Sequence, residues 1–266
     1  MKNRHMMTLL LIYLLMLLAV LLLQRKMMYF PDRFTSEQQE KLLAEAHVKP
    51  WPSDSELHGL IAKTPVRKAK GTVLVFHGNA GAAIHRTYFI NGLQKLGYRV
   101  IIAEYPGYGT RTGSPSEAIL IKDGIETAKM ALREFKEDLI LCGESLGSGV
   151  VAGILASHEV PVKGLLLITP FDSMTKVAHH HYWFFLAKWL LWDRYDNVAR
   201  LSDFQGHVAV LMAEQDDVIP NQHTLALFNS LPGPKKLWRV KNANHNNLPM
   251  GATQPWWTEV MHFLDH

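Results

Sequence analysis

The fold of this chain is decided by the stretch Asp138-Leu-Ile-Leu-Cys-Gly-Glu-Ser-Leu-Gly-Ser-Gly149. Its four apolar residues, Leu139 to Cys142, are typical of a buried strand in a parallel sheet, and a helical pattern follows. Between them stands G-x-S-x-G, Gly143 to Gly147, in which the glycines let neighbouring backbone approach the turn closely. A strand, sharp turn and helix in this order predict an α/β fold with Ser145 at the carboxyl end of the sheet.

The position of Ser145 at this turn suits a catalytic nucleophile. A serine at such a turn exposes its oxygen, and the backbone N–H of Leu146 opens the next helix. The positive end of a helix dipole favours negative charge there, so this N–H suits an oxyanion. Because a small-residue turn without chemistry matches the same five positions, the rest of the chain must decide between the two interpretations.

The remaining chain alternates between strand and helix patterns. Further strands are expected at 71–76, 99–103, 164–169, 208–213 and 235–240, and helices at 82–96, 116–135, 146–157, 221–231 and 255–264. A looser pattern at 55–62 predicts an edge strand. This order predicts a mostly parallel central sheet with helices on both faces and a site at the carboxyl ends of the strands.

The N-terminal segment is set apart by its composition. The run from Met6 to Leu23 carries no charge and spans roughly 27 Å as a helix, enough for a thin bilayer core. Arg25 and Lys26 follow it, without the small-x-small pattern of a signal-peptidase site, so a transmembrane anchor is predicted, with a signal peptide and a buried helix as alternatives. Basic residues flank both sides, which leaves the orientation open.

The expected organisation has three parts and one insertion. Residues 1–30 form the anchor, 31–52 a linker that ends in a Pro-Trp-Pro breaker, and 53–266 a single domain, which this length readily supports. The insertion, about 171–205, is long enough to be a helical lid over the carboxyl edge.

The insertion is unusually aromatic. Trp183, Phe184 and Trp189 are the residues expected to line a substrate pocket; contact with the membrane and simple packing on the core are the alternatives. The histidines at 179–181 have no acidic or cysteine residue at ligand spacing beside them, so no metal is predicted.

Composition excludes other classes. The net charge of +4 and the lack of long Lys/Arg clusters argue against nucleic acid as a partner. The single cysteine, Cys142, excludes an intrachain disulfide framework and lies on the predicted central strand, where it suits the core.

A nucleophilic serine needs a histidine base and an acid that orients it. Of the 14 histidines, His245 alone sits in the loop after the last predicted strand. Asp216 follows the strand at 208–213, which gives the order serine, acid, histidine. Asp217 and Asp172, each also near a strand end, are the alternatives for the acid.

A second oxyanion donor is expected after the strand at 71–76. There the backbone N–H of Asn79, or next that of Ala80, can face the carbonyl oxygen beside Leu146. The side chain of His77 is expected to brace this loop.

These motifs together resemble a known superfamily. Phe-His-Gly-Asn-Ala-Gly81, Tyr-Pro-Gly-Tyr-Gly109, Gly143-Glu-Ser-Leu-Gly, Asp216-x-Val-Ile-Pro and Asn-His245-Asn are similar to those of α/β-hydrolases, more narrowly the Bem46-like serine hydrolases related to the ABHD13 and ABHD17 groups. The likeness covers about 29–264 and implies esterase or thioesterase activity with Ser145, Asp216 and His245 as triad. Glu104 stands where such proteins commonly have Asp, and Pro106 where many have Arg; both lie outside the triad.

The sequence therefore predicts a membrane-anchored serine hydrolase that acts, without a cofactor, on a small ester or acyl substrate, lipid-like substrates included. An acyltransferase using the same triad, or a non-catalytic binding protein on the same fold, are the alternatives. The natural substrate, the side of the membrane and the oligomeric state are left open.

Overall fold

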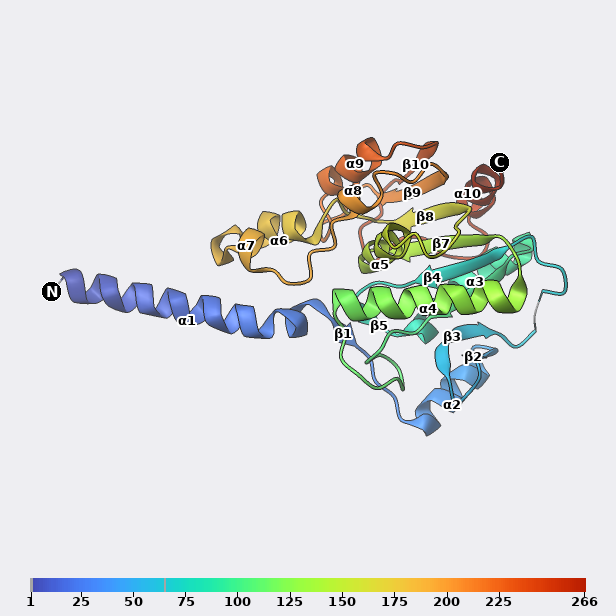
Figure 1. Ribbon diagram of the computed structural model, residues 1–266, viewed down its shortest axis with the longest axis horizontal. Helices are drawn as coiled ribbons and strands as arrows, with labels where there is room; N and C mark the ends of the chain where they lie inside the picture. Colours follow the sequence, from blue (N-terminus) through green and yellow to red (C-terminus); the bar gives the residue numbers. More distant parts are fainter. Residues whose placement is uncertain (1, 65) are drawn as a thin grey trace.

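The structure is a computed structural model that describes residues 2–64 and 66–266. Its main strands are β2 (Val48–Pro52), β3 (Leu57–Ala62), β4 (Thr72–Phe76), β6 (Arg99–Ala103), β7 (Leu139–Glu144), β8 (Gly164–Ile168), β9 (His207–Ala213) and β10 (Lys235–Val240). Within the described residues they form one eight-stranded sheet in the order β10-β9-β8-β7-β4-β6-β3-β2 (Figure 1). The strands from β10 to β6 are parallel, and β3 and β2 are antiparallel additions at one edge.

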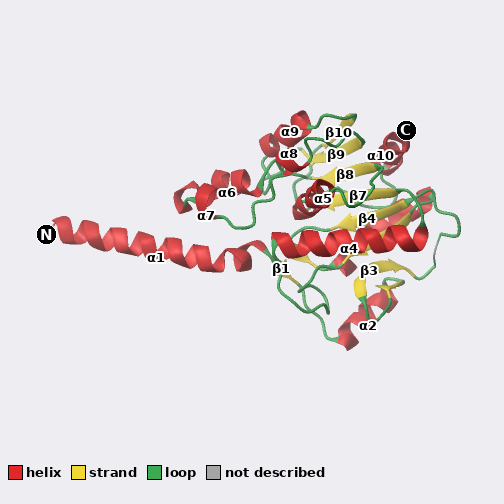
Figure 2. Cartoon of the chain, viewed as in Figure 1, coloured by secondary structure: helices red, strands yellow, loops and turns green. Residues whose placement is uncertain are grey.

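Helices cover both faces of this sheet (Figure 2). They are α2 (Ser36–Glu45), α3 (Tyr88–Leu93), α4 (Glu117–Phe135), α5 (Leu146–Ala156), α8 (Asn197–Arg200), α9 (Asn221–Ser230) and α10 (Pro255–Asp265), with short 3₁₀ turns η1 (Ala83–Arg86) and η2 (Gln94–Leu96). One core lies between the sheet and α4, α5 and α9, and a second between the sheet and α3 and α10. The predicted α/β fold is confirmed.

The two cores explain the continuous apolar strands of the sequence. In β4, Leu74 and Phe76 belong to the first core, whereas Val73 and Val75 belong to the second, and all four side chains are buried. A parallel strand that is buried on both faces needs apolar residues at every position rather than at alternate ones. The same division places Cys142 of β7 in the second core.

Some element boundaries differ from the sequence-based prediction. Within 31–52, the structure has α2 and then β2, and β2 pairs with β3 as the outermost strand of the sheet. The segment 55–62 therefore supplies the second strand from this edge. The helix expected at 82–96 is divided into η1, α3 and η2, and its start is held by the Ala83 N–H, which donates to the Glu104 carboxylate at 3.2 Å.

The N-terminal helix α1 (Lys2–Met28) projects away from the sheet (Figure 1). The insertion lies beside it and contains α6 (Met174–Tyr182), η3 (Trp183–Phe185) and α7 (Ala187–Leu190). We call α6, η3 and α7 the lid. The hydroxyl of Tyr13 on α1 donates to the carbonyl oxygen of Phe184 at 2.6 Å, which joins the two.

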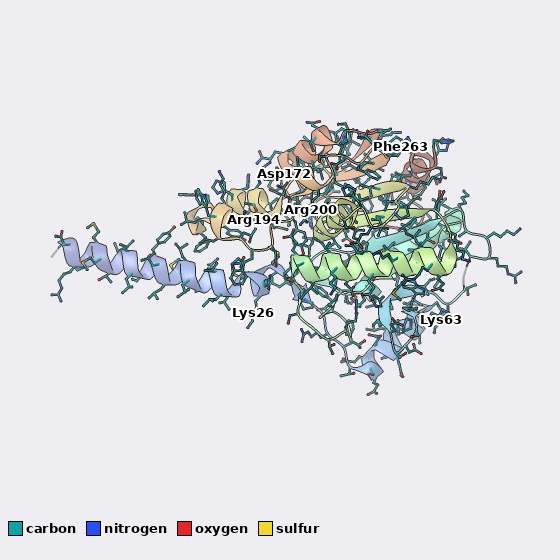
Figure 3. All side chains as sticks on the ribbon, viewed as in Figure 1. Lys26, Lys63, Asp172, Arg194, Arg200 and Phe263 are labelled. Atoms are coloured by element: carbon teal, nitrogen blue, oxygen red, sulfur yellow. The ribbon has the colours of Figure 1, made fainter. Side chains whose placement is uncertain are left out.

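A polar cluster fixes the base of α1, the end at which Figure 3 shows Lys26. The guanidinium of Arg25 makes two hydrogen bonds to the carboxylate of Asp193, at 3.0 and 3.1 Å. The Tyr29 hydroxyl lies 3.0 Å from the same carboxylate and 2.9 Å from the hydroxyl of Tyr195. Immediately after α1, β1 (Phe30–Pro31) pairs with β5 (Ala80–Gly81), the strand next to Asn79. The segment that follows the lid is therefore tied to α1, and α1 to the loop after β4.

Candidate active site

Ser145 occupies a strained turn between β7 and α5. Its backbone has φ 52° and ψ −116°, a conformation that costs a non-glycine residue of order 1–3 kcal/mol. Its N–H donates to the Ile168 carbonyl oxygen at 2.8 Å, which anchors the turn to β8. The Gly147 position leaves no room for a side chain, because a Cβ there would lie 1.9 Å from the Phe76 carbonyl oxygen. A Cβ at Gly143 would lie 2.6 Å from Ser148 Cα, so both motif glycines are required.

His245 lies in the loop after β10, within reach of Ser145. The distance from His245 Nε2 to Ser145 Oγ is 2.9 Å. An Asx turn holds the loop, since Asn244 Oδ1 accepts the N–H groups of Asn246 at 3.0 Å and Asn247 at 3.1 Å. The Gln215 N–H donates to the Ala243 carbonyl oxygen at 2.8 Å, which joins this loop to the one after β9.

Asp216, in the loop after β9, completes the arrangement. Its Oδ2 lies 2.8 Å from His245 Nδ1, and its Oδ1 accepts the N–H groups of Val218 at 3.0 Å and Ile219 at 2.7 Å. A carboxylate only accepts, so Nδ1 carries the imidazole proton and Nε2 is left to accept from the serine hydroxyl. The Asp216 side chain is 1% exposed, which keeps water from competing for it.

Neither of the two alternative acids is hydrogen-bonded to His245, whose polar partners among the described residues are Ser145 and Asp216. Asp217 lines the cavity beside Ser145. Asp172 is buried at the end of β8 and pairs with His223 Nδ1 at 2.9 Å and with Lys176 Nζ at 3.2 Å. The Asp172–His223 pair had no signal in the sequence, because nothing in a helical pattern predicts that His223 turns toward the end of β8.

The loop after β4 brings Asn79 to the same place as Leu146. Both residues line the cavity at Ser145. The Asn79 carbonyl oxygen accepts the Tyr108 hydroxyl at 2.7 Å and the Phe30 N–H at 2.9 Å, which fixes the peptide group between Asn79 and Ala80. The Asn79 side chain donates to the Met28 carbonyl oxygen at 2.8 Å. The last residue of α1 thus helps to hold this loop.

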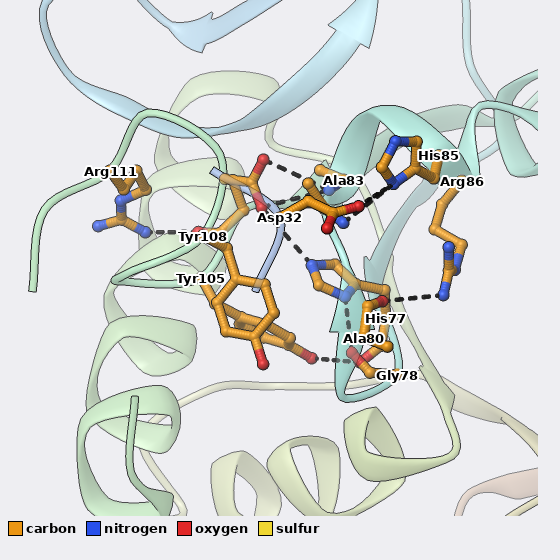
Figure 4. A network of polar contacts seen from close by, with 12 residues as sticks. Asp32, His77, Gly78, Ala80, Ala83, His85, Arg86, Tyr105, Tyr108 and Arg111 are labelled. Atoms are coloured by element: carbon orange, nitrogen blue, oxygen red, sulfur yellow. Dashed lines mark hydrogen bonds and ion pairs between the residues drawn. The ribbon is translucent and has the colours of Figure 1, made fainter. Parts of the chain in front are cut away.

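A buried aromatic cluster supports the loop from behind (Figure 4). The His77 ring packs against both Tyr105 and Tyr108, with ring centroids 4.3 and 5.5 Å away, and His77 is fully buried. The Tyr105 hydroxyl donates to the His77 carbonyl oxygen at 2.7 Å, and burial raises the pKa of Tyr105 well above its usual range, which keeps this donor protonated. Glu104 lies 3.6 Å from His77 Nε2. The buried His77 ring is therefore part of the packing that supports this loop.

A cavity of about 470 Å³ opens at Ser145. Apolar residues dominate its lining, which comes from the lid, the loop after β9 and α1; its lid residues include Met174, Val177, Tyr182, Phe185 and Leu190. Such a cavity beside the Ser145 hydroxyl suits an apolar group attached to a carbonyl.

The aromatic residues named from the sequence as pocket residues are not the ones that line this cavity. Trp183, Phe184 and Trp189 are 64%, 42% and 64% exposed, and Tyr182 and Phe185 line the cavity in their place. The reason is a change of helical phase: α6 ends at Tyr182, and Leu186 has φ 53°, a left-handed conformation that reorients the next turn. The expectation of Trp183, Phe184 and Trp189 as pocket residues was wrong.

A mostly parallel sheet with a strained serine turn after its central strand, and a serine, histidine and aspartate in hydrogen-bond contact at its carboxyl edge, defines the α/β-hydrolase class. A sequence model of the family described as serine aminopeptidase, S33, matches residues 67–194. The chain is 31% identical over 188 residues to human α/β hydrolase domain-containing protein 17B, covering 68% of this chain and 62% of that protein. It is also 31% identical over 179 residues to the lysophosphatidylserine lipase ABHD12 of Xenopus tropicalis, covering 59% and 46%.

Solved structures agree on the fold. A monoacylglycerol lipase from Paleococcus ferrophilus superposes with a TM-score of 0.57 at 19% identity, covering 76% of this chain and 95% of that one. The chain is an α/β-hydrolase related to the ABHD proteins, as the motifs predicted. It spans less than two thirds of the length of these curated relatives.

Proposed function

We propose that the protein is a membrane-anchored serine hydrolase that cleaves carboxylic ester or thioester bonds through an acyl-enzyme on Ser145. The observation that carries the proposal is the unbroken hydrogen-bond chain from Ser145 Oγ through His245 to Asp216, at the mouth of an apolar cavity. One relative, ABHD12, is named as a lysophosphatidylserine lipase, which supports an ester substrate with an acyl chain.

The geometry supports a two-step reaction. His245 Nε2 takes the proton of Ser145 as the serine oxygen attacks the carbonyl carbon, and the backbone N–H groups of Leu146 and Asn79 stabilise the oxyanion. The imidazolium formed, held by Asp216, gives its proton to the leaving alcohol or thiol. Water activated by His245 then adds to the acyl-enzyme and releases the acid and the free serine.

The fate of Ser145 provides the test. A fluorophosphonate probe should label the detergent-solubilised native chain, because only an activated serine attacks it at a useful rate. Ser145→Ala and His245→Ala should not be labelled, while circular dichroism shows that both variants keep the fold. Labelling of Ser145→Ala, or folded native protein that neither labels nor hydrolyses p-nitrophenyl esters, contradicts the proposal.

The membrane anchor is a second part of the proposal. Within the described residues, one helix is long and apolar enough to cross a membrane, the 26 residues from Asn3 to Met28. Exposed Trp183, Trp189 and Trp192 lie beside it on and after the lid, as residues at a membrane interface do. The intact mass of protein extracted from membranes tests this: an anchor keeps α1, whereas a signal sequence is removed and leaves a shorter chain.

A further inference from the structure

One face of α1 lines the cavity that contains Ser145. The residues of α1 that take part are Val20, Leu21, Gln24, Met27 and Met28. They share the cavity with the lid, which faces them from the other side. An anchor that served only to hold the domain at a membrane would contribute nothing to this lining.

The burial along α1 has the period of a packed helix face. Tyr13, Leu17, Leu21, Gln24 and Met28 are buried or half-buried, at steps of three and four residues. Val20, beside Leu21, is also half-buried, and the other residues from 14 to 27 are exposed. Leu17 is 9% and Gln24 7% exposed, against 65% for Leu22. The sequence of α1 does not reveal this face, because a helix that is apolar on all sides has no amphipathic pattern.

Hydrogen bonds fix the separation of α1 from the lid. The Gln24 side chain accepts the Trp192 N–H at 2.8 Å and donates to the Leu190 carbonyl oxygen at 3.3 Å. Together with the bond from Tyr13 to Phe184, these contacts extend over about 16 Å of α1, counted from Tyr13 to Gln24. If α1 spans a bilayer, these contacts hold the lid at the membrane, where its exposed Trp183 and Trp189 suit the interface.

We propose that α1 is one wall of the acyl-binding site and that Leu21, with Val20, sets the length of acyl group accepted at Ser145. The acyl chain packs between this face of α1 and the lid, with its carbonyl carbon at Ser145. This inference rests on the proposed function. It assigns to the anchoring helix a second task, the selection of substrate, and it implies that the acyl chain enters from the membrane side.

Paired variants of the full chain in detergent micelles test the wall. Leu21→Trp fills the cavity, so the ratio of kcat/KM for p-nitrophenyl palmitate to that for p-nitrophenyl butyrate should fall by at least about tenfold. Leu21→Ala widens the cavity and should raise the same ratio, a gain that a merely damaged fold would not produce. Leu22→Trp, the same change one residue further along α1, should leave the ratio within about twofold of native.

A second measurement does not depend on turnover. A diazirine-bearing palmitate should crosslink to the peptide 17–28 and to the lid, and excess palmitate should compete with it in the native chain and in Leu22→Trp but not in Leu21→Trp. Two results would overturn the proposal that α1 forms a wall of the acyl-binding site. One is an equal kcat/KM ratio in Leu21→Trp and Leu22→Trp; the other is crosslinking at 17–28 that excess palmitate does not reduce. If the chain hydrolyses no ester but excess palmitate still reduces the crosslinking, the result would contradict the hydrolase proposal and would support α1 as a wall of the acyl-binding site.

Discussion

At the scale of single residues, the sequence predicted which side chains meet at Ser145 because each stands at a strand end. Ser145, Asp216 and His245 follow β7, β9 and β10, and a parallel sheet brings such ends to one edge. Two adjacent residues in one loop both follow the same strand end, so only the structure distinguishes Asp216 from Asp217 as the partner of His245. The backbone N–H groups of Val218 and Ile219 turn the Asp216 carboxylate toward His245.

The two aspartates give a matched pair of variants. Asp216→Asn should lower kcat by about 10³–10⁴-fold, because an amide donor opposite Nδ1 favours the wrong tautomer of His245. Asp217→Asn, which removes the same charge one residue away, should cost less than about tenfold, since the hydrogen bond to the imidazole comes from Asp216. Steady-state kinetics on p-nitrophenyl butyrate measures both, and a greater loss in Asp217→Asn would assign the acid to that residue.

At the scale of elements, the strands were more predictable than the lid. A strand that is buried on both faces appears in the sequence as a continuous apolar run. The strands β4, β7, β8 and β9 coincide with such runs. The lid is a nine-residue helix followed by two short turns with a left-handed residue, Leu186, between them, so aromatic composition alone does not tell which of its rings face the cavity. Its contacts with α1 join residues more than 160 positions apart, which no local pattern can reveal.

The ion pair at the base of α1 should hold the lid closed. Arg25 is 45% exposed and its bonds to Asp193 are therefore worth at most about 1 kcal/mol, or roughly fivefold in the opening of the lid. Arg25→Ala should accelerate tryptic cleavage after the exposed Lys188 by about that factor. Lys26→Ala removes an equal charge from the next position and should leave the cleavage rate unchanged; equal acceleration in both variants would show that only the net charge matters.

At the scale of the whole molecule, the sheet centre is shielded by both cores at once. Cys142 is fully buried in β7, and burial raises the pKa of its thiol well above the ordinary value. The folded chain therefore keeps this proton where the unfolded chain loses it. The contribution of the thiol to stability is complete below the ordinary pKa, which is 9.0, and is lost as the pH rises above it.

The single cysteine thus reports on unfolding. Maleimide labelling of Cys142 at pH 8 should be slow in the native chain and should accelerate with urea in parallel with the loss of far-ultraviolet circular dichroism, because no smaller opening exposes the middle of the sheet. Rapid labelling without urea, with the circular dichroism intact, would show that β7 opens locally.

The bond from Asn79 to the Met28 carbonyl oxygen has a practical consequence. Membrane hydrolases are commonly trimmed to a water-soluble catalytic part before kinetic study. Trimming this chain before Tyr29 would remove the acceptor that holds the Asn79 side chain, along with Val20, Leu21 and Gln24. The trimmed chain would have a cavity open along one side and a looser loop after β4. The substrate range measured on the trimmed chain would then reflect the truncation. Substrate selectivity should therefore be measured on the intact chain in a bilayer mimic.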